Sequence, residues 1–134
     1  LNRRKLASIV FADRRKLKRM ESIIYPYILA SILHTLAKRE KAGDRAVFLD
    51  APTLYQSGAD ILCQRVVAVL APPEDRLRRI MERDGLTADE AKARMACQPG
   101  DDFFEKRVDH VIRNTGRMPG LRLDVLELQN KLGL

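Results

Sequence analysis

The sequence contains no tryptophan, only two cysteines and only seven glycines among its 134 residues. Cys63 and Cys97 lie far apart and in no metal-ligand spacing, which excludes a zinc module and a disulfide scaffold. A chain that uses cysteine so sparingly is expected in the reducing cytoplasm. No apolar run approaches the ~18 residues that span a bilayer, so we expect no membrane partner.

None of the glycines is followed by lysine. A P-loop needs the pattern G-x-x-x-x-G-K-[ST] between a strand and a helix, because its backbone N–H groups and its lysine cradle the phosphates of a nucleotide. The chain therefore lacks a phosphate cradle of this kind. The spacing of His, Cys, Ser and acidic residues predicts neither a metal cluster nor a Ser-His-Asp arrangement.

Positive charge is concentrated in the first third of the chain. Residues 1–45 carry twelve basic and four acidic side chains, a net charge of +8, whereas the whole chain carries +7. Such basic residues either form the solvated face of a helix or attract a polyanion. Nucleic-acid-binding domains interleave aromatic residues with the basic ones, and the only tyrosines in this stretch are Tyr25 and Tyr27. We therefore expect a phosphate-rich small molecule and no nucleic acid, with a basic nucleic-acid-contacting domain kept as an alternative.

Short apolar runs predict three strands that are buried on both faces, as in a parallel sheet. Prolines follow the first two runs, and a polar turn sequence follows the third. The three predicted strands are 46–50, 66–70 and 109–113.

Apolar residues at helical spacing predict helices in the other segments. Asp13 suits the N-cap of a helix that Pro26 should break or kink, and Thr87 opens a capping box with Glu90. Alternating buried strands and helices predict an α/β fold, which binds its ligands outside the carboxyl ends of its strands. The expected helices are 3–12, 13–25, 27–41, 73–85, one that begins after Thr87, and 119–132.

Asp50 follows four apolar residues at the end of the first predicted strand. In nucleotide-binding proteins, a carboxylate in this place holds a magnesium ion or a water bound to it. An aspartate at a strand end is also a common turn former, so this residue by itself leaves both interpretations open.

Arg76, Arg79 and Arg83 recur at i, i+3 and i+7 on the helix predicted at 73–85. They form either a solvated face or the face of a lid helix that neutralises transferring phosphates, because phosphoryl transfer spreads negative charge over several oxygens. Asn114 and Gly116 follow the third predicted strand. They form either a simple turn or a loop whose backbone groups hydrogen-bond the edge of a base.

Several motifs recur in a fixed order along residues 1 to about 132. They are Leu1-Asn2-Arg3-Arg4, Val10-Phe11, Tyr25-Pro26, LDAPTLYQSG at 49–58, RIMERD at 79–84, Gln98, and DHVIRNTG at 109–116. In order and spacing this set resembles the dephospho-CoA kinases. The resemblance implies an α/β fold with a parallel-sheet, P-loop kinase-like core of which three strands are present here. It also implies a helical acceptor-binding region and a lid.

The resemblance further implies transfer of the ATP γ-phosphoryl to the ribose 3′-hydroxyl of dephospho-CoA, the last step of coenzyme A biosynthesis, with Mg²⁺ as a cofactor. ATP and dephospho-CoA are then the expected partners. The segments it suggests are a helical CoA-substrate region at 1–45, core strands at 46–72, lid helices at 73–108, and the last core strand with the C-terminal helix at 109–134.

The resemblance also assigns roles to residues. It makes Asp50, Arg79 and Arg83 catalytic, with Asp50 acting indirectly on magnesium. It places Arg83, Asn114 and Gly116 against the nucleotide. The expected substrate-binding residues are Arg4, Tyr25, Pro52, Leu54 and Gln56.

The chain departs from the family pattern in informative places. Tyr25 stands where the family usually has histidine, Gln56 where it has glutamate, and Phe104 near the place of a lid lysine. The P-loop that the family carries before this region is missing, so we expect an N-terminally truncated kinase that is inactive alone. A degenerate, non-catalytic module that binds a nucleotide or CoA is the alternative, and a monophosphate kinase acting on another acceptor is a further one.

Overall fold

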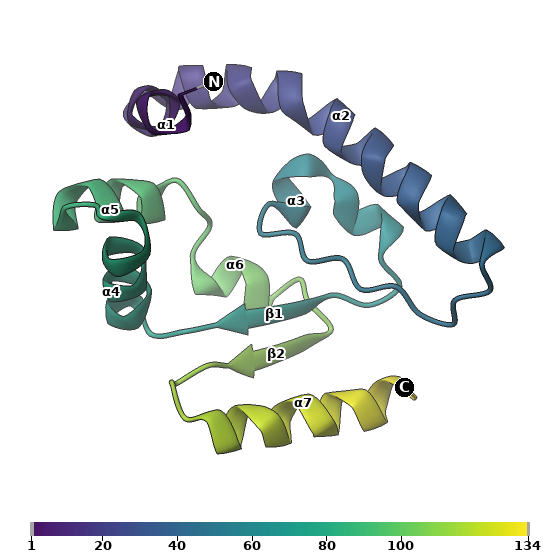
Figure 1. Ribbon diagram of the computed structural model, residues 1–134. Coiled ribbons are helices and arrows are strands. Elements are labelled where there is room, and N and C mark those ends of the chain that lie inside the picture. Colours follow the sequence, from purple (N-terminus) through teal and green to yellow (C-terminus); the bar gives the residue numbers. More distant parts are fainter. Residues whose placement is uncertain (1, 134) are drawn as a thin grey trace. The chain divides into compact units, whose positions relative to one another are not determined.

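The computed structural model describes residues 2–133 of the chain (Figure 1). The chain divides into two compact units, Leu1–Gln64 and Arg65–Leu134, each of which is described by itself.

The first unit begins with two helices in contact, α1 (Arg3–Phe11) and α2 (Arg14–Lys41). The Asn2 side chain caps α1 by accepting a hydrogen bond from the Lys5 N–H at 3.0 Å. Asp13 caps α2 by accepting from the Arg15 N–H at 2.9 Å, as the sequence predicts.

Pro26 lies inside α2 and does not end it, so the prediction of a break between two helices was wrong. A proline inside a helix removes one N–H and leaves the carbonyl four residues earlier without its partner. Both Ser22, which carries that carbonyl, and Pro26 are exposed, so water can satisfy the freed group. The helix therefore continues through the proline over 28 residues.

The expected strand at 46–50 does not form. The segment has no regular secondary structure, and no strand pairs with it in the described part of the chain. Val47 and Phe48 are 44% and 79% exposed instead of buried. A strand is stable only when a neighbour takes up its backbone hydrogen bonds, and an apolar pattern cannot supply that neighbour.

Two short turns complete the first unit. Helix α3 (Leu54–Ser57) is followed by the 3₁₀ turn η1 (Ala59–Leu62), and α3 packs on α2. Gly58 joins the two turns with φ at +73°, a left-handed conformation that glycine adopts without strain. Ala59 is fully buried at this junction.

The second unit contains a parallel two-stranded sheet, β1 (Val67–Leu70) and β2 (His110–Arg113). Val67 pairs with His110 and Leu70 with Arg113, which confirms two of the three predicted strands and their parallel order. Ala68, Leu70 and Ile112 are buried.

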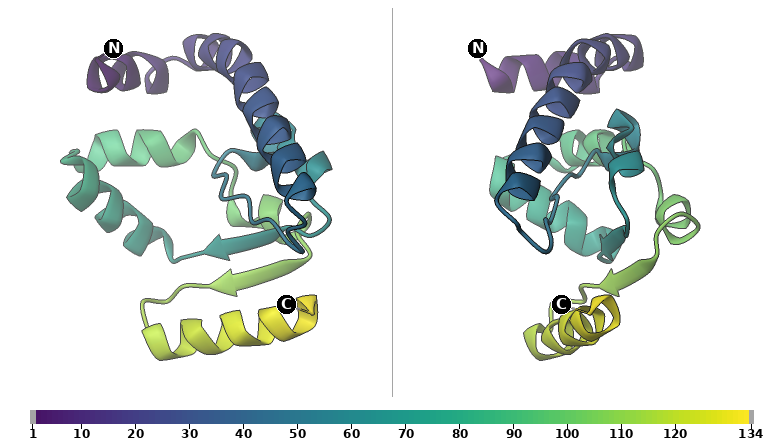
Figure 2. Two further views of the ribbon diagram at one scale, coloured as in Figure 1. Left: turned by 45° about the vertical axis from the view of Figure 1, so that its right-hand side comes forward. Right: turned by 90° about the vertical axis from the view of Figure 1, so that its right-hand side faces the viewer.

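Four helices accompany this sheet: α4 (Pro73–Asp84), α5 (Ala88–Ala96), α6 (Asp101–Glu105) and α7 (Met118–Leu132). The predicted capping box is present, because Thr87 and Glu90 bond each other's backbone N–H groups. Helix α7 runs beside β2, α6 contacts β1, and α4 contacts α5 (Figures 1 and 2). The helices predicted at 73–85 and 119–132 are thereby confirmed, to within a residue at their ends.

Helix α2 corrects the expectation about long apolar segments. It contains an 18-residue window with a mean hydropathy of 1.2, which meets the length and composition of a membrane-crossing helix. Core helices and signal sequences meet the same criterion, so this is weak evidence for a membrane span.

Candidate active site

In the second unit, a polar loop follows β2 at the carboxyl edge of the sheet, and Ala71 and Pro72 follow β1 at the same edge. The Asn114 N–H donates to the Leu70 carbonyl at 2.7 Å, so the residue after β2 is bonded to the last residue of β1. The Asn114 Oδ1 accepts from the Gly116 N–H at 3.1 Å, and Gly116 has φ at +84°. The predicted loop is therefore a tight turn at the ligand-binding edge of the sheet.

Two residues separate β1 from helix α4, which carries the three arginines of the predicted stripe. They differ in their partners. Arg76 forms an ion pair with Asp101 at 3.0 Å, which ties α4 to α6. Arg79 is half-buried and makes no ion pair or hydrogen bond within residues 2–133, whereas Arg83 is exposed and bonded to Asp84. Arg79 is therefore a cation without a carboxylate partner among the described residues, Arg83 is an exposed cation held by Asp84, and Arg76 is a structural tie.

Asp84 is the last residue of α4, and its carboxylate accepts hydrogen bonds from two arginines. Arg83 donates to it from Nε at 2.9 Å and from Nη2 at 2.8 Å. Arg94 of α5 donates to the same carboxylate from Nη1. The hydrogen bond from Arg83 is the largest cause that holds the pKa of Asp84 below its usual value, and the same bond raises the pKa of Arg83.

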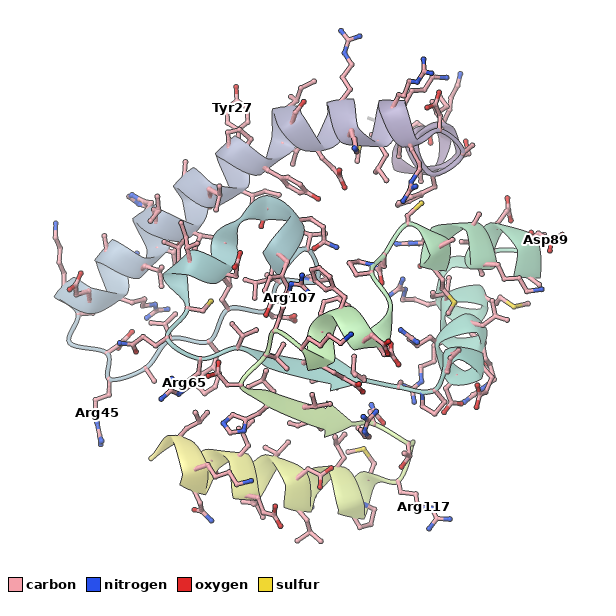
Figure 3. The ribbon with its side chains drawn as sticks, turned by 180° about the vertical axis from the view of Figure 1, so that it is seen from behind. Tyr27, Arg45, Arg65, Asp89, Arg107 and Arg117 are labelled. Carbon is pink, nitrogen blue, oxygen red and sulfur yellow. The ribbon has the colours of Figure 1, made fainter. Side chains whose placement is uncertain are left out.

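In the first unit, Tyr25 connects α2 to the segment before α3. Its hydroxyl donates to Glu21 Oε1 at 2.9 Å, and it also hydrogen-bonds the Thr53 side chain. Burial, with the bond to Glu21 and its charge, raises the pKa of Tyr25 to about 12. By contrast, Tyr27 is 76% exposed and points outward in Figure 3. Of the two neighbouring tyrosines, Tyr25 is the one held by side-chain hydrogen bonds to Glu21 and Thr53.

Three other predicted substrate residues lie in or beside α3. Pro52 is exposed, Leu54 begins the helix, and Gln56 lies inside it. The Oε1 atom of Gln56 is buried and accepts no hydrogen bond within the described residues. A buried acceptor without a donor is costly in a folded protein, so this atom fits a ligand N–H or O–H. The side chain of Arg4 lies outside the described part of the structure.

Asp50 lies in the irregular segment before Pro52 and is exposed. Its carboxylate makes no ion pair or hydrogen bond to any described residue. Within residues 2–133 no group of three His, Cys, Asp or Glu side chains is arranged to hold a metal ion. Mg²⁺ is usually held by one or two carboxylates with water and substrate phosphates, so Asp50 fits as a single ligand or as the acceptor for a bound water.

Helix α6 shows what replaces the expected lid lysine. Phe104 stacks edge-on against Phe103, with ring centroids 5.3 Å apart. The guanidinium of Arg107 lies 4.0 Å from the Phe103 ring centre. The two phenylalanines therefore form an aromatic cluster with a cation over it, a geometry that stabilises the local turn.

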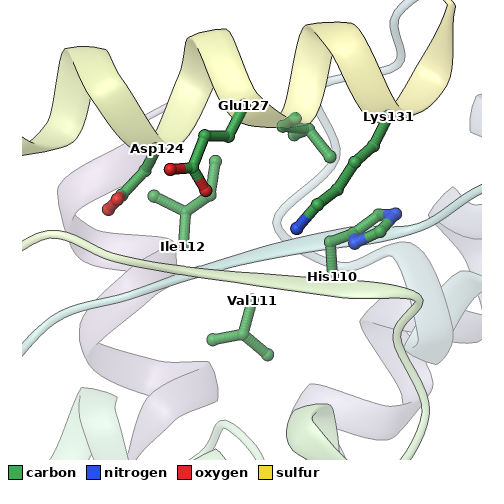
Figure 4. Close-up of a pocket in the computed structure, with 7 residues that line it drawn as sticks. His110, Val111, Ile112, Asp124, Glu127 and Lys131 are labelled. Atoms are coloured by element: carbon green, nitrogen blue, oxygen red, sulfur yellow. The ribbon is translucent and has the colours of Figure 1, made fainter.

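Two pockets formed by residues 2–133 contain no predicted site residue. One, of about 110 Å³, lies between β2 and α7 and includes His110, Glu127 and Lys131, with the two α7 side chains directed toward the strand (Figure 4). The other, of about 260 Å³, is largely apolar and lies between α2 and the segment 47–49.

Sequence reasoning missed the side chains that hold the site residues. The four-residue spacing of Glu21 and Tyr25 on one helix is a signal that could have paired them. The sharing of Asp84 between α4 and α5, and the bond of Thr53 to Tyr25, have no such local signal.

A parallel sheet with a polar turn at its carboxyl edge, and with an arginine-bearing helix after its first strand, is consistent with an α/β architecture of the P-loop kinase type. Solved structures share it. One from Thermus thermophilus aligns with a TM-score of 0.70 and 33% identity over 98% of this chain and 68% of that chain. A dephospho-CoA kinase from Campylobacter jejuni aligns with a TM-score of 0.60 and 31% identity over 98% and 65% of the two chains.

Sequence relatives identify the family. Residues 1–119 match the dephospho-CoA kinase family. A dephospho-CoA kinase of Lactobacillus johnsonii is 35% identical over 99% of this chain and 67% of that protein, and one of Listeria innocua is 36% identical over 94% and 63%. This chain belongs to the dephospho-CoA kinase family, and it spans about two-thirds of the length of these relatives.

Proposed function

We propose that this chain forms the acceptor-binding, lid and adenine-side parts of a cytoplasmic dephospho-CoA kinase. The reaction transfers the γ-phosphoryl of ATP to the ribose 3′-hydroxyl of dephospho-CoA. One observation carries the proposal: within the second unit, the helix with Arg79 and Arg83 and the turn at Asn114 both follow the carboxyl edge of one parallel sheet. Nucleotides bind at this edge in open α/β sheets.

In this proposal, Arg79 and Arg83 supply positive charge to the ATP phosphates. Arg79 has no carboxylate partner within the described residues, and Arg83 is exposed enough to change partners. Charge that is already in place where negative charge develops lowers the barrier to phosphoryl transfer. Arg83, Asn114 and Gly116 then bind the nucleotide, with the backbone of the Asn114 turn offering polar groups to the adenine edge.

The acceptor contacts lie in the first unit. Tyr25 is held between Glu21 and Thr53, which fixes its ring beside the segment with Pro52 and Leu54. The buried, unpartnered Oε1 of Gln56 accepts a hydrogen bond from dephospho-CoA. The positive charge of residues 1–45, Arg4 included, attracts the pyrophosphate of that substrate.

Asp50 is assigned to magnesium, directly or through a bound water. When bound, Mg²⁺ neutralises the β- and γ-phosphate oxygens during transfer. The contribution of this chain is an exposed carboxylate with no competing cation among the described residues, which leaves its oxygens free for that purpose.

We further propose that the chain is inactive alone, because its sequence contains no P-loop to cradle the phosphates. The same observation favours one other function, a non-catalytic module that binds a nucleotide or CoA. The two proposals differ in whether the chain forms CoA once a P-loop segment is added to it.

The test measures formation of CoA from dephospho-CoA, ATP and Mg²⁺. The chain alone should give no product but should bind dephospho-CoA in calorimetry. A fusion that places the P-loop segment of the Lactobacillus johnsonii relative before residue 1 should form CoA. The same fusion with the P-loop lysine replaced by alanine is the control. If the fusion folds and binds both substrates without turnover, the non-catalytic module is the better description.

A further inference from the structure

We propose that Asp84 is a positioning residue. Without ATP it binds the Arg83 guanidinium, and it competes with the phosphates of ATP for that guanidinium. The inference rests on the proposed function, because it needs Arg83 to be a phosphate ligand.

The contacts within the second unit carry the argument. Arg83 places two donors, Nε and Nη2, on the two oxygens of the Asp84 carboxylate, at 2.9 and 2.8 Å. This is the forked geometry in which arginine also grips a phosphate. The donors that Arg83 would offer to ATP are therefore the ones that Asp84 occupies.

The pair is placed so that it can open. The Arg83 side chain is 65% exposed, and an exposed ion pair is weak because water screens both charges. A phosphate carries more negative charge than a carboxylate and offers three oxygens. It can therefore displace Asp84 from Arg83 with little loss of free energy.

Arg94 keeps Asp84 in place during the exchange. It donates to the same carboxylate from α5, and its side chain is only 34% exposed, about half the exposure of Arg83. When Arg83 turns to a phosphate, Asp84 still has a cation and the link between α4 and α5 persists. The less exposed arginine thus acts as the fixed partner and the more exposed one as the mobile partner.

A second arginine–aspartate pair on α4, Arg78 with Asp75, provides a matched control. Asp75 accepts from Arg78 Nη2 at 2.7 Å, and Arg78 lies 3.8 Å from Glu82 as well. Asp75→Asn therefore adds the same unit of positive charge to α4 as Asp84→Asn, but it releases an arginine that has no proposed phosphate role. The comparison separates release of Arg83 from a general rise in positive charge.

The experiment titrates the 134-residue chain with tripolyphosphate and follows the arginine Nε–H resonances by NMR. We expect Arg83→Ala to weaken binding and Asp84→Asn to tighten it about two- to fivefold, the range that the free energy of an exposed ion pair allows. Asp75→Asn should change the affinity less than Asp84→Asn does. The gain should vanish in the Arg83→Ala/Asp84→Asn double variant.

The outcomes distinguish the two proposals. If Arg83→Ala binds tripolyphosphate as tightly as the unchanged chain, or if neither binds, the phosphate role of Arg83 fails and this inference fails with it. If Arg83→Ala weakens binding but Asp84→Asn does not tighten it, only the inference about Asp84 is overturned. A gain equal to that of Asp75→Asn, or one that survives removal of Arg83, overturns it as well. Circular dichroism is the control that checks whether each variant retains its helices.

Discussion

The carboxylate of Asp109 accepts a hydrogen bond from the backbone N–H of Val66 at 2.8 Å, across 43 residues of sequence. The backbone N–H of Asp109 in turn donates to the Val66 carbonyl at 2.9 Å. These two bonds close the amino-terminal end of the β1–β2 pair and fix its register. Because register places the strand ends, this contact also sets where α4 and the Asn114 turn begin.

Replacement of Asp109 by alanine should therefore destabilise the sheet. We expect a loss of about 1 kcal/mol in the free energy of unfolding, the usual net worth of one hydrogen bond. Asp109→Asn keeps an acceptor oxygen in place and should lose much less, because the ion pair of Asp109 with Arg65 is long, at 3.6 Å, and exposed. Urea denaturation of the two variants tests this. Equal losses would show that the charge, not the hydrogen bond, stabilises the pair.

Tyr25 should give the first unit a distinctive response to high pH. Its pKa is about 12, above the ordinary value of 10.0, so the folded chain holds this proton more tightly than the unfolded chain does. The contribution of Tyr25 to stability is complete below pH 10 and is lost as the pH rises from 10 to 12.

Absorbance of tyrosinate across this range tests that response. The unchanged chain should show a late step that is missing in Tyr25→Phe, and Tyr27→Phe is the matched control that keeps it. A late step that persists in Tyr25→Phe would contradict the assignment.

Arg79 and Arg83, the proposed lid arginines, should matter for turnover more than for folding. In the active fusion described above, Arg79→Ala and Arg83→Ala should each lower kcat by about tenfold or more, because each removes positive charge from the developing transition state. Arg78→Ala, on the same helix but paired with Asp75 and Glu82, is the control and should leave kcat within about twofold. Wild-type turnover in both lid variants would refute their phosphate role.

Replacement of Asp50 should change how the rate of the same fusion depends on the Mg²⁺ concentration. Asp50→Asn preserves the shape of the side chain but removes its charge, and we expect a higher Mg²⁺ requirement with a lower rate. Asp60→Asn, in the η1 turn of the same unit, is the control. An unchanged rate and magnesium requirement in Asp50→Asn would remove Asp50 from the site.

Local patterns predicted much of the fold because the forces behind them are local. Asp13 and Thr87 cap their helices as expected, since a capping side chain bonds backbone groups two or three residues away. Short apolar runs also located β1 and β2. The candidate cations of α4 followed from helical spacing alone.

The failures depend on the surroundings of a segment, either a partner strand or access to water, which its own residues do not specify. The segment 46–50 has an apolar strand pattern but no paired strand in the described structure, so it forms no strand. Pro26 predicts a break by its own geometry, but exposure of the freed carbonyl at Ser22 lets α2 continue.

The sequence by itself determined the parallel α/β class, the family resemblance, the helix caps and the positions of the candidate side chains, because each depends on spacing along a few residues. Only the tertiary structure decided which partners those side chains have. It bonded Asp109 to Val66, placed Thr53 beside Tyr25, buried Gln56 Oε1 without a donor, and shared Asp84 between Arg83 and Arg94. These contacts join residues by packing and chain reversal, which no short stretch of sequence encodes.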